Sequence, residues 1–352
     1  MDEFPAVSSS DVSLAMSTLK DTMTTLMFHA EMIPPITASV GDDVQTSLPP
    51  LAPSGPLTSY STFLNSRPPA FETYAIEEIL SLAPIAPHLQ LHVVHLSAIE
   101  AIPILRTARE RGVKITAETC FHYLALASED VPEGDTRHKC CPPIRSSRNR
   151  DGLWEELSRH DSVLQTIVSD HSPCTPELKI LPHSMSHACG MSIQPKDIKL
   201  VNGHIMSKEE AAEIERGDFF ASWGGISSVG LGLPILWTEA ASRPAISILD
   251  VVRLCSVNTA KQVGLSHQKG ALRPGMDADI CVFADEETFV VGREQMLFRN
   301  KVSPYQGRQM RGVVKETWLR GVKTFERGGA NDGFVTKGGL ASGKLLLEKR
   351  MM

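Results

Sequence analysis

The stretch TIVSDHSPC, residues 166–174, changes its chemical character within three positions. Residues 166–168 carry β-branched side chains, which favour a packed, pleated strand. Asp170 and His171 follow almost at once, and Pro173 then prevents the strand from continuing. Aspartate, serine and proline are also ordinary turn residues. Taken alone, this strand end is therefore better explained by a turn than by a catalytic or metal-binding site.

The same arrangement recurs along the chain. Apolar stretches expected to be strands are TTLMFHAE (24–31), LQLHVVHLS (89–97), VKITAETC (113–120) and SVLQTIVSDH (162–171). Apolar residues at helical spacing lie between these strands, at 71–83, 97–112 and 146–160. Strands that alternate with helices in this way predict a parallel sheet. We therefore expect an α/β fold, a partial TIM-type (β/α) barrel.

Three of the expected strands end in a group that can bind a metal ion. These groups are His29, His95 and Asp170. In an α/β barrel, side chains at the carboxyl ends of the strands converge on one active-site mouth. Imidazole and carboxylate ligands around an open position are typical of a hydrolytic zinc ion. Each histidine alone is better explained as a hydrogen-bonded core residue, but the three in register predict a metal site.

The composition argues against several classes of partner. The chain has 352 residues, 42% of them hydrophobic, and a formal net charge of −6, which gives no reason to expect nucleic acid or an anionic membrane. No apolar run approaches the roughly 18–20 residues needed to span a bilayer. The seven cysteines include no C-x-x-C spacing, so a disulfide framework is not expected. A reducing, cytoplasmic setting fits best.

Other candidate sites are weaker. His183, His187 and Cys189 have the spacing of a metal trio on a helix, but the surrounding SMSHACGMS has a poor helical pattern, so we attribute the spacing to chance. Cys174 has no indicated base partner and is interpreted as structural. The loop WGGISS (223–228) fits equally a close backbone approach to a ligand and a simple tight turn.

The carboxyl-terminal third has a different pattern. Residues 247–265 are expected to be helical, residues 269–283 to lead through turns into a strand, and residues 313–329 to form a hairpin. These strands predict a small β appendage beside the barrel.

Seven longer motifs recur as a set in one enzyme family. They are HVVHLS (92–97), ETCFHYL (118–124), KCCPPIR (139–145), VSDHSPCTPELK (168–179), GDFFASWGGISS (217–228), SVNTAKQVGL (256–265) and KGALRPGMDADICVF (269–283). Together they resemble the cyclic amidohydrolases. SDHSP with PELK, followed by GDF and WGGISS, favours the allantoinase branch over the dihydropyrimidinases and dihydroorotases, which remain alternatives.

The resemblance implies a barrel with a β-sandwich appendage and a site with two zinc ions, bridged by a carboxylated lysine and a hydroxide. It assigns His29 and His95 to one ion and Asp170 to the other, with Asp170 also acting as general base. Residues assigned by analogy to hold a small ureide ring are Cys141, Pro142, Gly224 and Gly225. The implied reaction converts allantoin to allantoate in purine nitrogen catabolism, and the implied assembly is a homo-oligomer.

The chain also departs from the family pattern. It has no His-x-His pair, and Lys20, in a helix-like stretch, is not assigned as the bridging lysine. We therefore expect residues 1–265 to form the carboxyl-terminal half of a barrel, with an unusual insert at about 180–214. Residues 266–330 would be the β-sandwich appendage, and residues 331–352 a mobile tail.

Three functional hypotheses remain open at this point. The chain acts as a hydrolase that another segment or chain completes, or it acts alone with one zinc ion on His29, His95 and Asp170, or it is a non-catalytic remnant that assembles with an intact relative. A half-barrel would expose strand edges and apolar side chains, so we also expect association or marginal stability.

Overall fold

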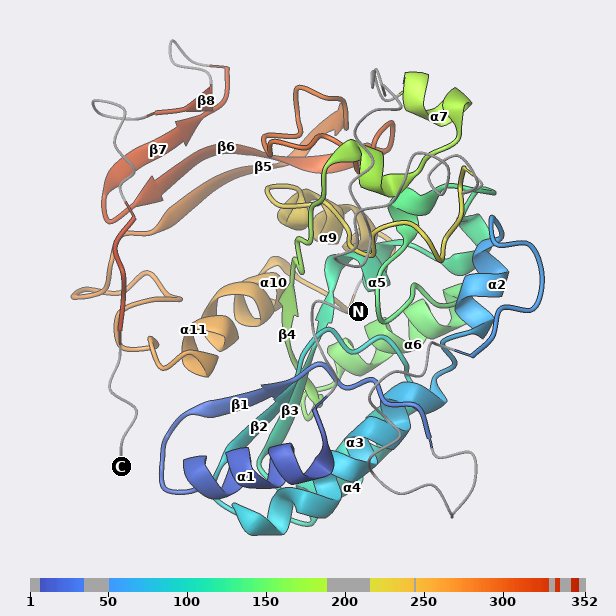
Figure 1. Cartoon of the computed structure of the whole chain (residues 1–352). Helices are drawn as coiled ribbons and strands as arrows, with labels where there is room; N and C mark the ends of the chain where they lie inside the picture. Colours follow the sequence, from blue (N-terminus) through green and yellow to red (C-terminus); the bar gives the residue numbers. More distant parts are fainter. Residues whose placement is uncertain are drawn as a thin grey trace.

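The chain folds around two separate β-sheets (Figure 1). The computed structural model describes residues 7–34, 51–188, 216–243, 245–328, 333–335 and 343–347. The first sheet is parallel and contains β1 (Thr25–Phe28), β2 (Gln90–Val93), β3 (Ile115–Cys120) and β4 (Leu164–Val168). The second is antiparallel and contains β5 (Ile280–Val290), β6 (Gln309–Leu319), β7 (Val322–Glu326) and β8 (Gly333–Phe334).

The parallel sheet keeps its strands in chain order, β1-β2-β3-β4. Phe28 pairs with Val93, and Cys120 pairs with Val168, so the four strands end at one edge of the sheet. This register confirms the α/β fold class and brings the residues that follow each strand to the same side of the molecule. Among the described residues, β1 and β4 are the outer strands of this sheet.

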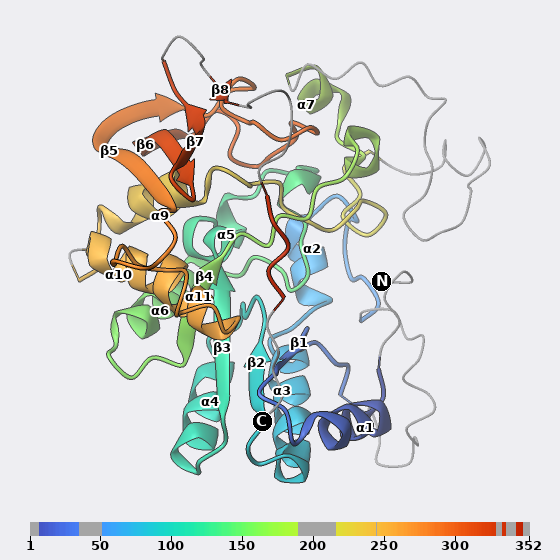
Figure 2. The ribbon, with the colours of Figure 1, turned by 90° about the vertical axis from the view of Figure 1, so that its left-hand side faces the viewer.

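Helices connect the parallel strands, as the apolar spacing predicts. The α-helices are α1 (Ser9–Leu19), α2 (Tyr60–Asn65), α3 (Ala70–Leu82), α4 (Ala101–Glu110), α5 (Phe121–Ala125), α6 (Ser147–Ser158), α7 (His183–Ala188), α9 (Gly232–Ala240), α10 (Ile248–Val252) and α11 (Asn258–Gln262). Helix α3 packs against α4, and both run along the sheet (Figure 2). Within the described ranges, no helix has the length and apolar content needed to cross a membrane.

Short 3-10 helices and one π-helical segment complete the connections. They are η2 (Ala83–Ile85), η3 (Ser128–Asp130), η4 (Thr136–His138), η5 (Pro176–Lys179) and the π-helical segment η6 (Arg253–Val257). Helix α4 ends as expected at Gly112, whose φ of 89° is a left-handed conformation that glycine adopts without a steric penalty. The helix predicted at 247–265 is correct in extent, but η6 separates it into α10 and α11.

Two of the short helices lie in stretches without a clear helical pattern in the sequence. Helix α2 lies in the stretch 32–70, which is rich in Pro, Ser and Thr, and its Phe63 is buried against the core. Helix α7 includes residues of the SMSHACGMS stretch that lacks a helical pattern. Most of the proposed insert at 180–214, Cys189 included, and most of the tail at 331–352 lie outside the described residues.

The core lies between the parallel sheet and its helices. Its strand residues include Leu91 and Val93 of β2, Ile115 of β3, and Leu164 and Ile167 of β4, none more than 2% exposed. Helices cover the sheet, as is typical of parallel sheets, but its strands also carry polar residues such as His92, Glu118 and Thr166. The strand ends are therefore fixed by a packed interior rather than by surface loops.

Helix α9 joins the two sheets. It packs against α5 on one side and against β6 on the other (Figure 1). A Cβ atom at Gly232 would lie 2.3 Å from Phe121 Cε2, so only glycine allows this close approach of α9 to α5. The hairpin predicted at 313–329 is confirmed by the antiparallel pairing of β6 with β7.

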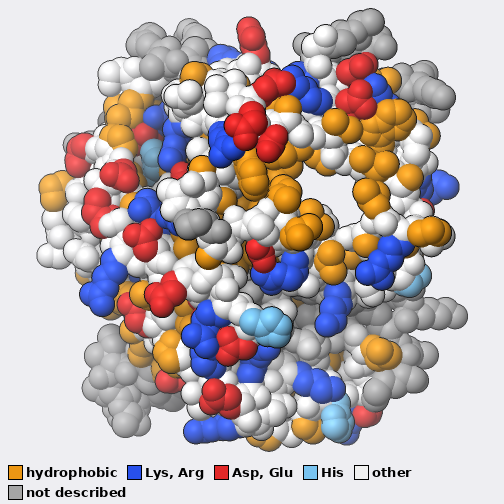
Figure 3. Space-filling view, turned by 180° about the vertical axis from the view of Figure 1, so that it is seen from behind, with side chains coloured by type: hydrophobic (Ala, Val, Ile, Leu, Met, Phe, Trp, Pro, Cys, Tyr) orange, Lys and Arg blue, Asp and Glu red, His pale blue; other side chains and the backbone are white. Residues whose placement is uncertain are grey.

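Hydrophobic side chains surround an opening on the face opposite to that of Figure 1 (Figure 3). Large apolar side chains exposed on the second half of the chain include Leu249 of α10 at 76% and Val290 of β5 at 57%. Exposed apolar area of this kind favours association with another surface. This agrees with the expected exposure of apolar groups, and the marginal stability stays a prediction.

Candidate active site

His29, His95 and Asp170 lie at the carboxyl ends of β1, β2 and β4. The rings of His29 and His95 touch edge to face, with 4.6 Å between their centroids. The charge of Asp170 acts on the pKa of His95, so all three groups belong to one neighbourhood. His95 and Asp170 have φ values of 39° and 42°. These are left-handed backbone conformations, which are uncommon for residues other than glycine. Such strain is found most often at functional sites.

His29 is paired with an acid. Its Nε2 atom lies 2.9 Å from Glu31 Oε2, and Arg67 Nη1 lies 3.6 Å from the other carboxylate oxygen. Burial acts to raise the pKa of Glu31, but the hydrogen bond from His29 and the charge of Arg67 outweigh it and lower that pKa to about 2. The ionised Glu31 orients the ring of His29, whose side chain is 42% exposed.

His95 is buried and incompletely bonded. It is 8% exposed, and among the described residues its Nδ1 atom has no hydrogen-bond partner. Burial and the neighbouring His29 lower the pKa of His95, while Asp170 and Glu31 oppose that shift. The neutral form is the one that binds metal. Two histidines, a carboxylate and an unpartnered buried ring nitrogen are a donor set that fits a zinc ion.

A second group of donors lies at the end of β3. Cys120 Sγ, a ring nitrogen of His122 and a carboxylate oxygen of Asp170 all lie within 4.8 Å of one another. No other three histidine, cysteine or acidic side chains gather so closely in the part of the chain that the structure describes. Burial and His95 lower the pKa of His122 to about 3. These two donors were not predicted from the sequence, where ETCFHYL served only as a family motif, although a thiol and an imidazole two positions apart were a usable signal.

The loops assigned to substrate binding lie against each other. A Cβ atom at Gly224 would be 3.7 Å from Cys141 Sγ, and the Gly225 N–H donates to the carbonyl of Lys139 at 2.8 Å. The Tyr123 hydroxyl donates to the carbonyl of Pro142 at 2.7 Å. The four residues predicted to bind substrate, Cys141, Pro142, Gly224 and Gly225, therefore come from two loops in contact. Their binding role stays a prediction.

His171 anchors the glycine loop rather than facing the metal-ligand candidates. Its Nδ1 atom accepts hydrogen bonds from the backbone N–H groups of Ser228 and Val229, at 3.0 and 3.1 Å. Next to it, the Ser172 N–H donates to the carbonyl of Ile226 at 3.1 Å. The loop 223–228 is thus fixed to the end of β4, directly beside Asp170.

Two buried lysines hold the same loop and the residues that lead into it. Lys179 Nζ donates to the carbonyls of Gly225 at 2.7 Å and Trp223 at 3.0 Å. Lys139 Nζ donates to the carbonyls of Phe220 and Ser222, and burial lowers the pKa of Lys139 to about 8. Neither lysine was predicted from the sequence, because these contacts join segments far apart in the chain.

Asp135 supports the loop that leads into residues 139–145. Its two carboxylate oxygens accept hydrogen bonds from Arg137 Nε and Nη2, each at 2.7 Å, and its side chain is 1% exposed. Burial acts to raise the pKa of Asp135, but bonds from Arg137 and His138 dominate and hold it far below the ordinary 3.8. The folded state is thus stabilised above about pH 4, and this contribution is lost as the pH falls toward the folded pKa.

We expect Asp135→Asn to lower the free energy of unfolding at pH 7 by about 2 kcal/mol, because a buried charge-assisted pair is lost. The difference between variant and wild type should shrink at pH 3, and urea unfolding at both pH values measures it. Asp161→Asn is the matched control, since Asp161 also pairs with an arginine but its side chain is 61% exposed. An equal loss for both variants, or a loss independent of pH, would contradict the assignment.

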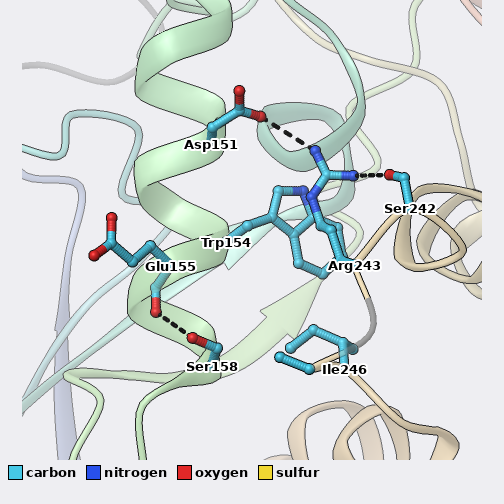
Figure 4. A pocket seen from close by; sticks show the side chains of 8 residues that line it. Asp151, Trp154, Glu155, Ser158, Ser242, Arg243 and Ile246 are labelled. Carbon is cyan, nitrogen blue, oxygen red and sulfur yellow. Dashed lines mark hydrogen bonds and ion pairs between the residues drawn. The ribbon is translucent and has the colours of Figure 1, made fainter.

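A surface pocket of about 430 Å³ lies elsewhere, between α6 and residues 242–246 (Figure 4). In it the guanidinium of Arg243 lies over the ring of Trp154, 4.7 Å from the ring centre, and bonds to Asp151 at 3.2 Å. None of the residues that line it belongs to the strand ends, and its cation is already paired. We therefore place the candidate active site at the strand ends and not in this pocket.

Comparison with known proteins identifies the family and agrees with the fold. Residues 85–324 match the amidohydrolase family. The allantoinase of Saccharomyces cerevisiae is 40% identical over 326 residues, covering 91% of this chain and 59% of that protein. Probable allantoinase 2 of Dictyostelium discoideum is 37% identical, over 93% of this chain and 58% of that protein.

Solved structures show the same fold. The L-hydantoinase (dihydropyrimidinase) from Arthrobacter aurescens matches with a TM-score of 0.70 at 20% identity, over 94% of this chain and 63% of that one. The dihydropyrimidinase from Brevibacillus agri matches with a TM-score of 0.64 at 25% identity, over 92% and 60%. The chain thus spans about three fifths of the length of these relatives. From the family match over most of its length and from this fold, the chain belongs to the amidohydrolase family.

Proposed function

We propose that this chain acts as an allantoinase, which hydrolyses the cyclic amide of allantoin to allantoate in purine nitrogen catabolism. The observation that carries the proposal is the similarity to allantoinases, at 37–40% identity over more than 90% of the chain. The solved hydantoinase and dihydropyrimidinase structures are less similar, at 20–25% identity. The substrate is accordingly a small cyclic ureide.

His29, His95 and Asp170 would hold zinc in this function. They converge at the ends of three parallel strands, and the ring of His95 has an unpartnered nitrogen. When bound, zinc acidifies a water molecule and polarises the carbonyl that the water attacks. Glu31 keeps the ring of His29 oriented through the 2.9 Å bond, as acidic partners of metal-binding histidines do.

Asp170 would move the proton. A carboxylate beside the reacting groups can take the proton of the attacking water and pass it to the leaving ring nitrogen. The left-handed backbone at Asp170 turns the chain sharply after β4. The bond from Ser172 to Ile226 holds the following residues, so the carboxylate stays at the sheet edge.

The two loops in contact would bind the ureide ring. Backbone groups at Cys141, Pro142, Gly224 and Gly225 can pair with its amide donors and acceptors. Lys179 holds the glycine loop through the carbonyl of Gly225, and Lys139 holds the residues before that loop through the carbonyl of Phe220. The thiols of Cys120, Cys140 and Cys141 are free, which agrees with a reducing compartment such as the cytoplasm.

The proposal is tested by assaying the full chain, loaded with zinc, against allantoin, hydantoin and dihydrouracil. We expect preferential hydrolysis of allantoin, and Asp170→Asn should lower kcat by roughly 10²–10⁴-fold through the loss of proton transfer. Asp161→Asn is the control for removing one acidic charge and should leave turnover unchanged. Folded, zinc-loaded chain that turns over dihydrouracil in preference, or hydrolyses no allantoin, would contradict the proposal.

A further inference from the structure

Two metal-binding side chains at the end of β3, Cys120 and His122, have no role in the proposed function. Cys120 is the last residue of β3, and His122 lies in the first turn of α5. Their sulfur and ring nitrogen and a carboxylate oxygen of Asp170 lie within 4.8 Å of one another. Both Cys120 and His122 are fully buried. Three donors from two strand ends and a helix therefore face one small interior space.

His122 provides an independent indication that a ligand is bound there. Among the described residues, neither of its ring nitrogens has a hydrogen-bond partner, although the ring is 0% exposed. Buried polar groups are almost always hydrogen-bonded, and an exception calls for an explanation such as a bound ion. The ring of Tyr123 packs against His122 with 4.2 Å between centroids, which fixes its orientation.

The chemistry of the donors indicates the class of ion. A thiolate and an imidazole are preferred by zinc and by other thiophilic divalent ions, and a carboxylate completes a three-ligand set with a fourth position open. Calcium and magnesium take oxygen ligands, which this cluster does not offer in sufficient number. On binding, the Cys120 S–H bond breaks, the proton leaves to solvent and a sulfur–metal bond forms, with no change in oxidation state.

We propose that Cys120, His122 and Asp170 bind one thiophilic divalent ion, such as Zn²⁺. This site differs from the proposed zinc site of His29, His95 and Asp170. The two sites have only Asp170 in common. It does not depend on the proposed hydrolysis, because the cluster is defined by geometry and donor chemistry alone.

Cobalt absorption tests the proposal on the full chain. Metal-free protein is titrated with Co²⁺, and a thiolate ligand is recognised by its intense near-ultraviolet charge-transfer band. We expect the band to reach its maximum when one Co²⁺ ion is bound at the site of Cys120, His122 and Asp170. The band should be absent in Cys120→Ser. Cys255→Ser is the matched control, since Cys255 is a free cysteine outside the cluster, and it should retain the full band.

Two histidine variants separate this site from the other pair. His122→Ala should weaken cobalt binding and reduce the thiolate band, whereas His29→Ala combined with His95→Ala should leave the band intact. A band that survives Cys120→Ser, or one that is lost with His29 and His95, would overturn the proposal. Neither result depends on whether the chain hydrolyses allantoin.

A measurement without any substitution guards against variants that fail to fold. X-ray absorption of the wild-type chain carrying one equivalent of Zn²⁺ should show a sulfur neighbour at about 2.3 Å. A coordination shell of nitrogen and oxygen alone would reject the site directly.

Discussion

Replacing Glu72 with alanine should lower the free energy of unfolding by about 3–5 kcal/mol, because it leaves a buried charge without its partner. Glu72 is 1% exposed in α3, and its Oε1 atom accepts hydrogen bonds from Arg145 Nη2 at 2.7 Å and Nε at 3.2 Å. Its Oε2 atom accepts from the backbone N–H groups of Ser97 and Ala98, at 2.8 and 3.1 Å. One carboxylate therefore fixes both the segment after His95 and the loop before α6.

Chemical denaturation of the variant and of Glu77→Ala tests this expectation. Glu77 lies on the exposed face of the same helix, so its removal should have little effect. Arg145→Ala should cost far less in the Glu72→Ala background than in the wild type, because the two residues act as a pair. Additive effects of the two substitutions would show that the pair is not coupled.

Gly225→Ala should destabilise the chain by about 3 kcal/mol, because a side chain at this position collides with fixed backbone. An added Cβ atom would lie 2.2 Å from the Ser172 carbonyl oxygen and 2.7 Å from Ser172 Cβ. Neither neighbour can move easily, since Ser172 is bonded to Ile226 and the Gly225 carbonyl accepts a bond from Lys179. We expect a loss of allantoin turnover as well, because the shift would displace the loop beside Asp170.

Gly224→Ala is the natural control for this substitution. A Cβ atom there would lie no closer than 3.7 Å to Cys141 Sγ, an ordinary van der Waals distance. Thermal unfolding of the two variants should therefore differ clearly, with Gly224→Ala close to wild type. Similar melting temperatures for both would show that the loop adapts and that the contact with Ser172 is not rigid.

The fold class and the convergence of the strand ends were predictable from the sequence. A chain in which apolar strands alternate with helices can adopt only a few architectures. In a parallel sheet the strands end at one edge, which brings His29, His95 and Asp170 together. Strong local sequence signals also predicted the structure correctly. One example is Gly112, which was expected to end the helix that is α4 in the structure. Helix α2 was missed because Phe63 and Tyr60 are helical through packing with Phe219, a distant residue, rather than through periodicity.

The interior of the site was less predictable. Lys139 and Lys179 hold the carbonyls of residues 220–225, and no sequence pattern relates segments so far apart. Cys120 and His122 were visible in ETCFHYL, but their closeness to Asp170 depends on the register in which β3 pairs with β4. That register includes an irregularity between Ala117 and Glu118, which alternation of apolar residues does not reveal.

The chain order of the parallel strands also influences how the protein folds. Within the parallel sheet, the segment between Val93 and Ile115 is the shortest connection between neighbouring strands, and the segment from Phe28 to Gln90 is the longest. The entropy lost on closing a loop increases with its length, so β2 and β3 are favoured to pair first and β1 to join last. His95 and Cys120 would then meet early in folding, before β4 delivers Asp170 and β1 delivers His29. We therefore expect the site to be assembled in stages, in the order in which the strands pair.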